Sequence, residues 1–128
     1  MKYLIDSHVL LWLIAESHKV GTKTKELLQE EDAKVYVSVA SLWELSLKAG
    51  KGKLPITAKS ILTGVDLLHI DTIDITAAHI KSFDQTTTNH ADPFDLMLCA
   101  QAKTEDMVLI TADKILLDIF PDSLDALQ

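Results

Sequence analysis

The sequence contains no arginine. All twelve of its basic residues are lysines, and nineteen acidic residues bring the formal net charge to −7. Proteins that bind nucleic acids usually carry a basic surface and use arginine for paired contacts to phosphate. This composition argues against nucleic-acid binding through protein charge alone. An RNA substrate would need metal ions or a partner chain to neutralise its phosphates.

Other residues and motifs with a known chemistry are scarce as well. Cys99 is the single cysteine, so no internal disulfide can form, and its apolar neighbours predict a place in the core. Trp12 and Trp43 also lie in apolar helical runs, which predicts a core or interface position. The five histidines show no zinc spacing, and neither a glycine-rich phosphate loop nor a nucleophile elbow is present. Zinc, P-loop and serine-hydrolase chemistry are therefore disfavoured.

Long apolar runs are missing too. There is no stretch of roughly 18 apolar residues, and no basic N-terminal segment leads into a cleavable apolar one. We therefore expect a soluble, cytoplasmic protein without a membrane segment. With 128 residues, 48% of them hydrophobic, and no internal repeat, the chain is predicted to form a single domain over residues 1–128.

The apolar pattern predicts alternating strands and helices. Short apolar or β-branched runs indicate strands at 2–5, 33–38, 67–70 and 107–110. Helical spacing is found at 9–15, 22–31, 39–49, 58–63, 76–83 and 93–105, with a short helix at 114–117. A turn is expected at 48–55, a polar loop at 86–90, and a short edge strand after Phe120. The alternation predicts a three-layer α/β/α sandwich around a mostly parallel sheet.

Acidic residues gather at one edge of this predicted sheet. Asp6 follows the first strand and Asp113 the last, while Asp92 and Asp95 open a helix that begins at the same edge. Glu44 lies roughly 8 Å along its helix, so that helix has to tilt toward the edge. Ligands of open parallel sheets bind beyond the carboxyl ends of the strands. Clustered carboxylates repel one another, and in the absence of a cysteine or histidine set the natural counterion is Mg²⁺ or Mn²⁺.

Each acid also has an ordinary structural role open to it. Segment 92–95 has the pattern of a helix N-cap, and Asp6 and Asp113 can cap the helices that follow them. Glu44 can pair with Lys48 four residues on, a contact worth about 0.2–0.5 kcal/mol. Its apolar neighbours predict a largely buried helix, in which an unpaired carboxylate costs several kcal/mol. Separate caps do not explain a shared edge, so we favour a ligand role.

Two further sets of residues accompany the acids. Ser7 and Thr111 flank acidic positions, and either hydroxyl can orient a carboxylate or a bound water. Lys48, Lys51 and Lys53 form the densest basic cluster. They are candidates for steering an RNA backbone, and a solvated flexible loop is an equally good reading.

Taken in order, these residues resemble the PIN-domain proteins of the VapC toxin type. The matching phrases are Leu-Ile-Asp-Ser-His-Val-Leu-Leu-Trp-Leu, Ser-Leu-Trp-Glu-Leu, Asp-Pro-Phe-Asp followed by Ala-Gln-Ala, and Leu-Ile-Thr-Ala-Asp, and they extend from Tyr3 to about Leu117. The resemblance implies an α/β/α fold and a Mg²⁺- or Mn²⁺-dependent endoribonuclease. It also implies a homodimer that a small antitoxin silences. The implied catalytic metal ligands are Asp6, Glu44, Asp95 and Asp113, with Asp92 as an accessory ligand.

Two positions depart from the pattern. Members of this subgroup often carry basic residues where this chain has Ala91 and Leu96. Our leading hypothesis is RNA cleavage by metal-activated water. An alternative is a catalytically weak binding module whose main role is complex formation with an antitoxin, which the acidic balance and the lack of arginine favour. A phosphohydrolase of small esters is disfavoured because His8, and not a second aspartate, stands two residues after Asp6.

Overall fold

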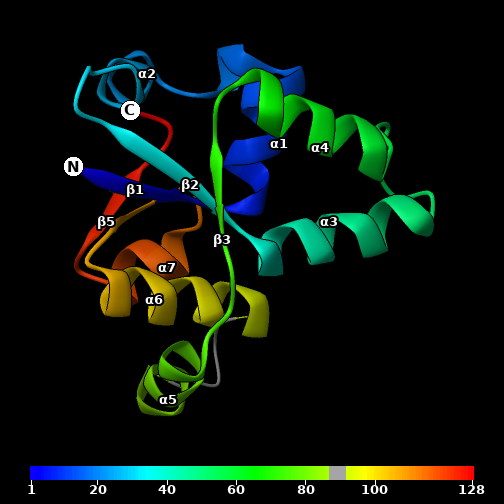
Figure 1. The fold of residues 1–128 in the computed structure, drawn as a ribbon. Coiled ribbons are helices and arrows are strands. Elements are labelled where there is room, and N and C mark those ends of the chain that lie inside the picture. Colours follow the sequence, from blue (N-terminus) through cyan, green and yellow to red (C-terminus); the bar gives the residue numbers. More distant parts are fainter. Residues whose placement is uncertain (87–91) are drawn as a thin grey trace.

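Five parallel strands form the centre of the molecule (Figure 1). They belong to a computed structural model that describes residues 1–86 and 92–128. The order across the sheet is β3-β2-β1-β4-β5. The strands are β1 (Lys2–Ile5), β2 (Lys34–Ser38), β3 (Asp71–Ile73), β4 (Val108–Thr111) and β5 (Ser123–Asp125).

Helices connect the strands and cover both faces of the sheet (Figure 1). They are α1 (Ser7–Ala15), the 3₁₀ helix η1 (Ser17–Lys19), α2 (Thr22–Leu28), α3 (Val39–Gly50), α4 (Ala58–Leu67), α5 (Ala77–Thr86), α6 (Pro93–Glu105) and α7 (Lys114–Ile119). None of the helices in the described part of the chain is long and apolar enough to cross a membrane.

Side chains that alternate along the strands pack into two apolar cores. Tyr3 and Ile5 of β1 face a core shared with α1, α3 and α4, while Leu4 between them faces a second core with α6 and α7. This two-sided burial follows from the period-two side-chain geometry of a strand and explains why the strands read as continuous apolar runs. Cys99 is buried in the second core, as predicted. The predicted α/β/α sandwich is confirmed.

The third predicted strand was misplaced. Residues 67–70 are not a strand, because Leu67 ends α4 and His69 adopts a left-handed φ of 55° that turns the chain. The edge strand β3 begins one residue beyond this segment, at Asp71, and its first two residues are exposed. An apolar run at a helix end had been taken for a buried strand. The predicted turn at 48–55 also starts too early, since α3 continues through Gly50.

The tail of the chain forms the predicted edge strand, β5, and then contacts α2. The backbone N–H of Gly21 donates to Ala126 O at 2.8 Å, and those of Lys23 and Thr24 donate to Gln128 O at 2.8 and 3.3 Å. A Cβ added to Gly21 would lie 1.8 Å from the carbonyl carbon of Gln128. Glycine is therefore required here for space.

The strand order places a topological switch between β1 and β4. From β1 the chain moves outward to β2 and β3, and it then returns to the other side of β1 to add β4 and β5. At such a point the connections diverge and leave a crevice beyond the carboxyl ends of the strands. Asp6 immediately follows β1, and Asp113 lies two residues beyond β4.

Candidate active site

An acidic cavity of about 340 Å³ opens where β1 and β4 end. The acids that line it come from the loops after β1 and β4, from the middle of α3 and from the start of α6. The structure thus brings together all five acids singled out in the sequence: Asp6, Glu44, Asp92, Asp95 and Asp113.

Asp6 is the most firmly held of these acids. Its side chain is buried, with 4% of the residue exposed, and its two oxygens accept different hydrogen bonds. Oδ1 accepts from the backbone N–H of Val9 at 2.9 Å, which makes Asp6 the N-cap of α1. Oδ2 accepts from the Thr111 hydroxyl at 2.5 Å. Burial raises the pKa of Asp6 above its usual range, and these hydrogen bonds oppose the rise.

Glu44 is held by two partners from different elements. The Ser7 hydroxyl donates to Oε1 at 2.9 Å, and Lys48 Nζ lies 3.4 Å from Oε2. The Glu44 side chain is 13% exposed. The expectation of a largely buried α3 is wrong, because Trp43 is 61% and Leu47 44% exposed. One face of α3 packs on the core and the other faces solvent, so apolar neighbours in sequence did not report the burial of Glu44.

Asp92 and Asp95 lie at the start of α6. Oδ1 of Asp92 accepts from the backbone N–H of Phe94 at 2.8 Å, so Asp92 is the N-cap of this helix. The pKa of Asp95 is raised to about 7, chiefly by burial and then by the negative charges of the other four cavity acids. The raised pKa therefore reflects both the burial of Asp95 and the concentration of negative charge in this cavity.

Asp113 combines the same two roles at the start of α7. Its Oδ1 accepts from the backbone N–H groups of Ile115 and Leu116 at 2.8 and 3.3 Å. Its own N–H donates to the Thr111 hydroxyl oxygen at 3.1 Å. Thr111 thus links Asp6 and Asp113 through one hydroxyl group. Capping and membership of the cavity coexist at Asp6, Asp92 and Asp113 alike.

The cavity offers the oxygen ligands that a hard divalent cation prefers. Carboxylate oxygens are the ligands that Mg²⁺ and Mn²⁺ prefer, and mutual repulsion among them favours a positive counterion. Within residues 1–86 and 92–128, however, no three such side chains converge in a ready-made metal site. Their oxygens are turned toward protein donors such as Thr111, Ser7 and helix N–H groups. The residues fit a metal by charge and ligand type.

Known proteins match both the sequence and the fold. The family model of the PIN domain matches residues 3–119, which is most of the chain. The chain belongs to the PIN-domain family. PIN domains are generally nucleases and typically use divalent metal ions. None of the curated protein sequences matches this chain.

Solved structures with the same fold include toxin–antitoxin complexes. VapBC2 from Rickettsia felis, bound to a promoter DNA fragment, has a TM-score of 0.74 at 18% identity, covering 98% of this chain and 97% of its own. DNA-bound VapBC from Salmonella typhimurium has a TM-score of 0.72 at 16% identity, with 98% of both chains covered. VapBC-1 from nontypeable Haemophilus influenzae has a TM-score of 0.71 at 15% identity over 100% of both. At this identity the likeness establishes the fold.

Other residues of this PIN domain also line the cavity, and some predicted site residues do not. His8 and Trp12 of α1 line it, and Trp12 also packs against the first core, where the sequence had placed it. Lys48 lines it as well, whereas Lys51 and Lys53 are exposed beyond the end of α3. The i, i+4 spacing of His8 and Trp12 on α1 was the sequence signal that could have placed both at the cavity.

The two departures from the subgroup pattern have different outcomes. Leu96 is buried within α6, so this position faces the protein interior and offers no contact to a substrate. Ala91 lies outside the described residues.

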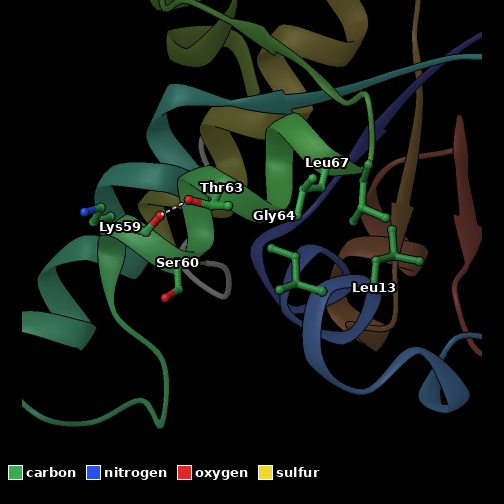
Figure 2. Close-up of a pocket in the computed structure, with 8 residues that line it drawn as sticks. Leu13, Lys59, Ser60, Thr63, Gly64 and Leu67 are labelled. Carbon is green, nitrogen blue, oxygen red and sulfur yellow. Dashed lines mark hydrogen bonds between the residues drawn. The ribbon is translucent and has the colours of Figure 1, made fainter.

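A separate groove lies between α1 and α4, and its lining is mainly apolar (Figure 2). Its volume is about 370 Å³, and Leu13 of α1 and Leu67 of α4 line it. Gly64 lets the two helices approach, because a Cβ there would lie 2.7 Å from the Ile14 side chain. Leu67 is 74% exposed. The PIN domain thus presents an acidic cavity and, elsewhere, an apolar groove.

Proposed function

We propose that this protein is a metal-dependent endoribonuclease and the toxin of a toxin–antitoxin pair. The observation that carries the proposal is that five carboxylates line one cavity at the switch point of a PIN-domain sheet. The raised pKa of Asp95 supports it, because strongly perturbed carboxyls in a cleft are typical of functional sites.

In this proposal Asp6, Glu44, Asp95 and Asp113 hold Mg²⁺ or Mn²⁺, with Asp92 as an accessory ligand. A bound ion of this kind supplies an activated water and stabilises negative charge on the scissile phosphate. Thr111 fixes the orientation of Asp6 by its hydrogen bond to Oδ2. Ser7 does the same for Glu44 through Oε1.

RNA can bind at this cavity only after the negative charge of its carboxylates has been neutralised. Phosphate and carboxylates repel each other, and the lysine at the cavity, Lys48, already contacts Glu44 at 3.4 Å. Cations held by the acids would therefore reverse the local potential. Exposed Lys51 and Lys53 would steer the RNA backbone from beyond the end of α3.

The direct test is RNA cleavage by the purified protein with Mn²⁺ and with EDTA. We expect cleavage with Mn²⁺ and none with EDTA. Asp6→Asn should lower the rate by at least about 100-fold, because it removes a charged ligand from the metal. Asp118→Asn is the matched control, since Asp118 is exposed on α7 outside the cavity and should cleave like the wild type.

Equal cleavage by the wild type and Asp6→Asn, with or without EDTA, would refute the mechanism. The identical purification of the three proteins also exposes a contaminating ribonuclease, which would give the same activity in each. Isothermal titration with Mn²⁺ adds a readout that is independent of RNA. Heat of binding should be present for Asp118→Asn and greatly reduced for Asp6→Asn.

We further propose that the protein acts in the cytoplasm as a homodimer and binds a small antitoxin. The solved structures named as VapBC complexes support such a partner. Sedimentation of the purified chain gives its oligomeric state, and co-expression with a candidate small antitoxin tests complex formation.

The second candidate, a catalytically weak binding module, has its own support. The net charge of −7 disfavours RNA binding, and the α1–α4 groove offers an apolar surface for a protein partner. Expression in bacteria separates the two candidates. The nuclease should arrest growth, and Asp6→Asn should relieve the arrest. A binding module should leave growth unaffected in both cases.

A further inference from the structure

An aromatic pair joins α3 and α6, the two helices that carry the cavity acids Glu44 and Asp95. The ring centroids of Trp43 on α3 and Phe94 on α6 are 5.4 Å apart, and their planes meet at 68° in an edge-to-face arrangement. Each ring belongs to the residue just before a cavity acid, Glu44 after Trp43 and Asp95 after Phe94. The backbone positions of the two rings are thus about 3.8 Å, one Cα–Cα step, from those of Glu44 and Asp95, and the rings lie outside the lining of the cavity itself.

Trp43 is exposed despite this contact. Its exposed fraction is 61%, whereas Phe94 is partly buried and supports it from α6. A tryptophan carries the largest apolar surface of any side chain and is mostly buried in folded proteins. An exposed ring that a second ring supports on one side is preorganised to receive a flat partner.

The charge of the protein explains why such a contact would matter for RNA. Most nucleic-acid binders gain affinity from cations at the phosphates, and this chain has no arginine and a net charge of −7. Lys48, which lines the cavity, is engaged with Glu44. Stacking of a neutral base on an aromatic ring does not depend on protein charge. It can supply affinity where the electrostatic contribution is unfavourable.

We propose that Trp43, supported by Phe94, stacks an unpaired nucleobase next to the scissile phosphate. This rests on the proposed ribonuclease function and makes the substrate single-stranded RNA, because a base in a duplex presents no free face. Trp43 is then a binding residue that contributes to substrate affinity, while the cavity acids contribute to the chemical step.

The test measures the affinity for RNA with all cavity acids intact, using a short labelled oligoadenylate whose linkages resist hydrolysis, so that cleavage does not interfere. Fluorescence anisotropy with Mn²⁺ follows its binding. Trp43→Ala should weaken binding by about 5- to 100-fold, the range expected for loss of one base–aromatic stack. Trp43→Phe keeps a ring and should stay within about 3-fold of the parent. An abasic ribose-phosphate oligomer of equal length should bind all variants alike.

Leu47→Ala is the matched control. Leu47 lies one helical turn beyond Trp43 on α3 and is 44% exposed, so it shares the apolar face and cannot stack. Its RNA affinity should equal that of the parent. If Trp43→Ala and Leu47→Ala lose RNA affinity together and also dissociate a dimer in sedimentation, this face is an interface between copies and the stacking site is refuted. Unchanged oligoadenylate binding by a folded Trp43→Ala refutes it as well.

Cleavage kinetics of the wild type and Trp43→Ala, both with intact cavity acids, separate this inference from the nuclease proposal. Cleavage in which Trp43→Ala leaves KM unchanged would overturn the stacking site and leave the nuclease standing. Trp43-dependent binding without any Mn²⁺-dependent cleavage by the wild type would overturn the nuclease and retain the RNA site. The expected result is a raised KM with little change in kcat.

Discussion

Close contacts have opposite effects on stability in two regions, the acidic cavity and the junction between α2 and the last residues of the chain. In the cavity, burial and then repulsion among the carboxylates raise the pKa of Asp95 to about 7. At the junction, the Gln128 backbone lies so close to Gly21 that no side chain fits. The first arrangement works against the folded state and the second is part of its packing. Sites that carry chemistry often reduce stability, which the rest of the fold has to offset.

The largest effect on stability should come from Gly21→Ala. The added Cβ would meet the backbone of Gln128 and Leu127, which cannot move aside as a flexible side chain can. We expect the free energy of unfolding to fall by about 3 kcal/mol or more, as for other overpacked sites. Gly21 has a φ of −63°, so backbone strain makes no contribution. Urea unfolding monitored by circular dichroism measures the change.

Gly50→Ala is the control for this substitution. Gly50 is the last residue of α3, and a Cβ there would have no heavy atom within 4 Å. We expect a gain of about 0.5–1 kcal/mol from the better helix propensity of alanine. Equal urea midpoints for the two alanine variants would contradict the assignment of Gly21 to a packed junction.

Thr111→Val should have the next largest effect. The hydroxyl that it removes donates to buried Asp6 and accepts from the N–H of Asp113. Loss of these contacts should reduce the free energy of unfolding by about 1–3 kcal/mol. The loss should grow with pH, because it is the ionised form of Asp6 that the hydroxyl stabilises. Thr63→Val, which removes an exposed hydroxyl bonded to Lys59 O, should change stability by less than about 0.5 kcal/mol.

Asp95→Asn should have a smaller effect with a distinct pH dependence. The pKa of Asp95 is raised from 3.8 to about 7, so between these values the folded protein keeps a proton that the unfolded chain has lost. Stability of the wild type therefore falls as the pH rises from about 4 to about 7 and is constant above that. Asp95→Asn lacks this loss and should be more stable than the wild type at pH 8 by roughly 1 kcal/mol after allowance for solvent screening.

Thermal unfolding in EDTA from pH 4 to pH 8 measures this difference. The two melting curves should converge toward pH 4, where Asp95 is protonated in both folded and unfolded wild type. Asp118→Asn, with its carboxylate exposed on α7, should follow the wild type throughout. A difference between Asp95→Asn and the wild type that is constant with pH would show that the charge of Asp95 is not its cause.

Much of the fold was predictable because the signals were local. Pro93 after Asp92 fixed the start of α6, and apolar runs located β1, β2 and β4 to within a residue or two. The edge strand β3 was missed because its first residues are polar and exposed, while the preceding apolar run belongs to the end of α4. Edge strands need little burial, so hydrophobicity identifies them poorly.

The sequence predicted the residues of the candidate site better than the contacts between them. A parallel sheet places the ends of β1 and β4 side by side, so Asp6 and Asp113 could be brought together from strand positions alone. Ser7 and Thr111 were expected to orient a carboxylate, but the acid that each contacts could not be predicted, because Thr111 is 105 residues from Asp6 and Ser7 is 37 from Glu44. Contacts at such separations depend on the packing angles of helices, which spacing does not encode. The exposure of Trp43 was missed for the same reason.

Three cavity acids, Asp6, Asp92 and Asp113, also begin helices. The amino ends of α1, α6 and α7 therefore bring partial positive charge to the place where negative charge accumulates. The chain thus carries some of its own neutralisation. We therefore expect the chain to refold in the presence of a chelator and to bind metal ions afterwards. The supply of ions would then control the activity of the protein and would not change the amount of folded protein.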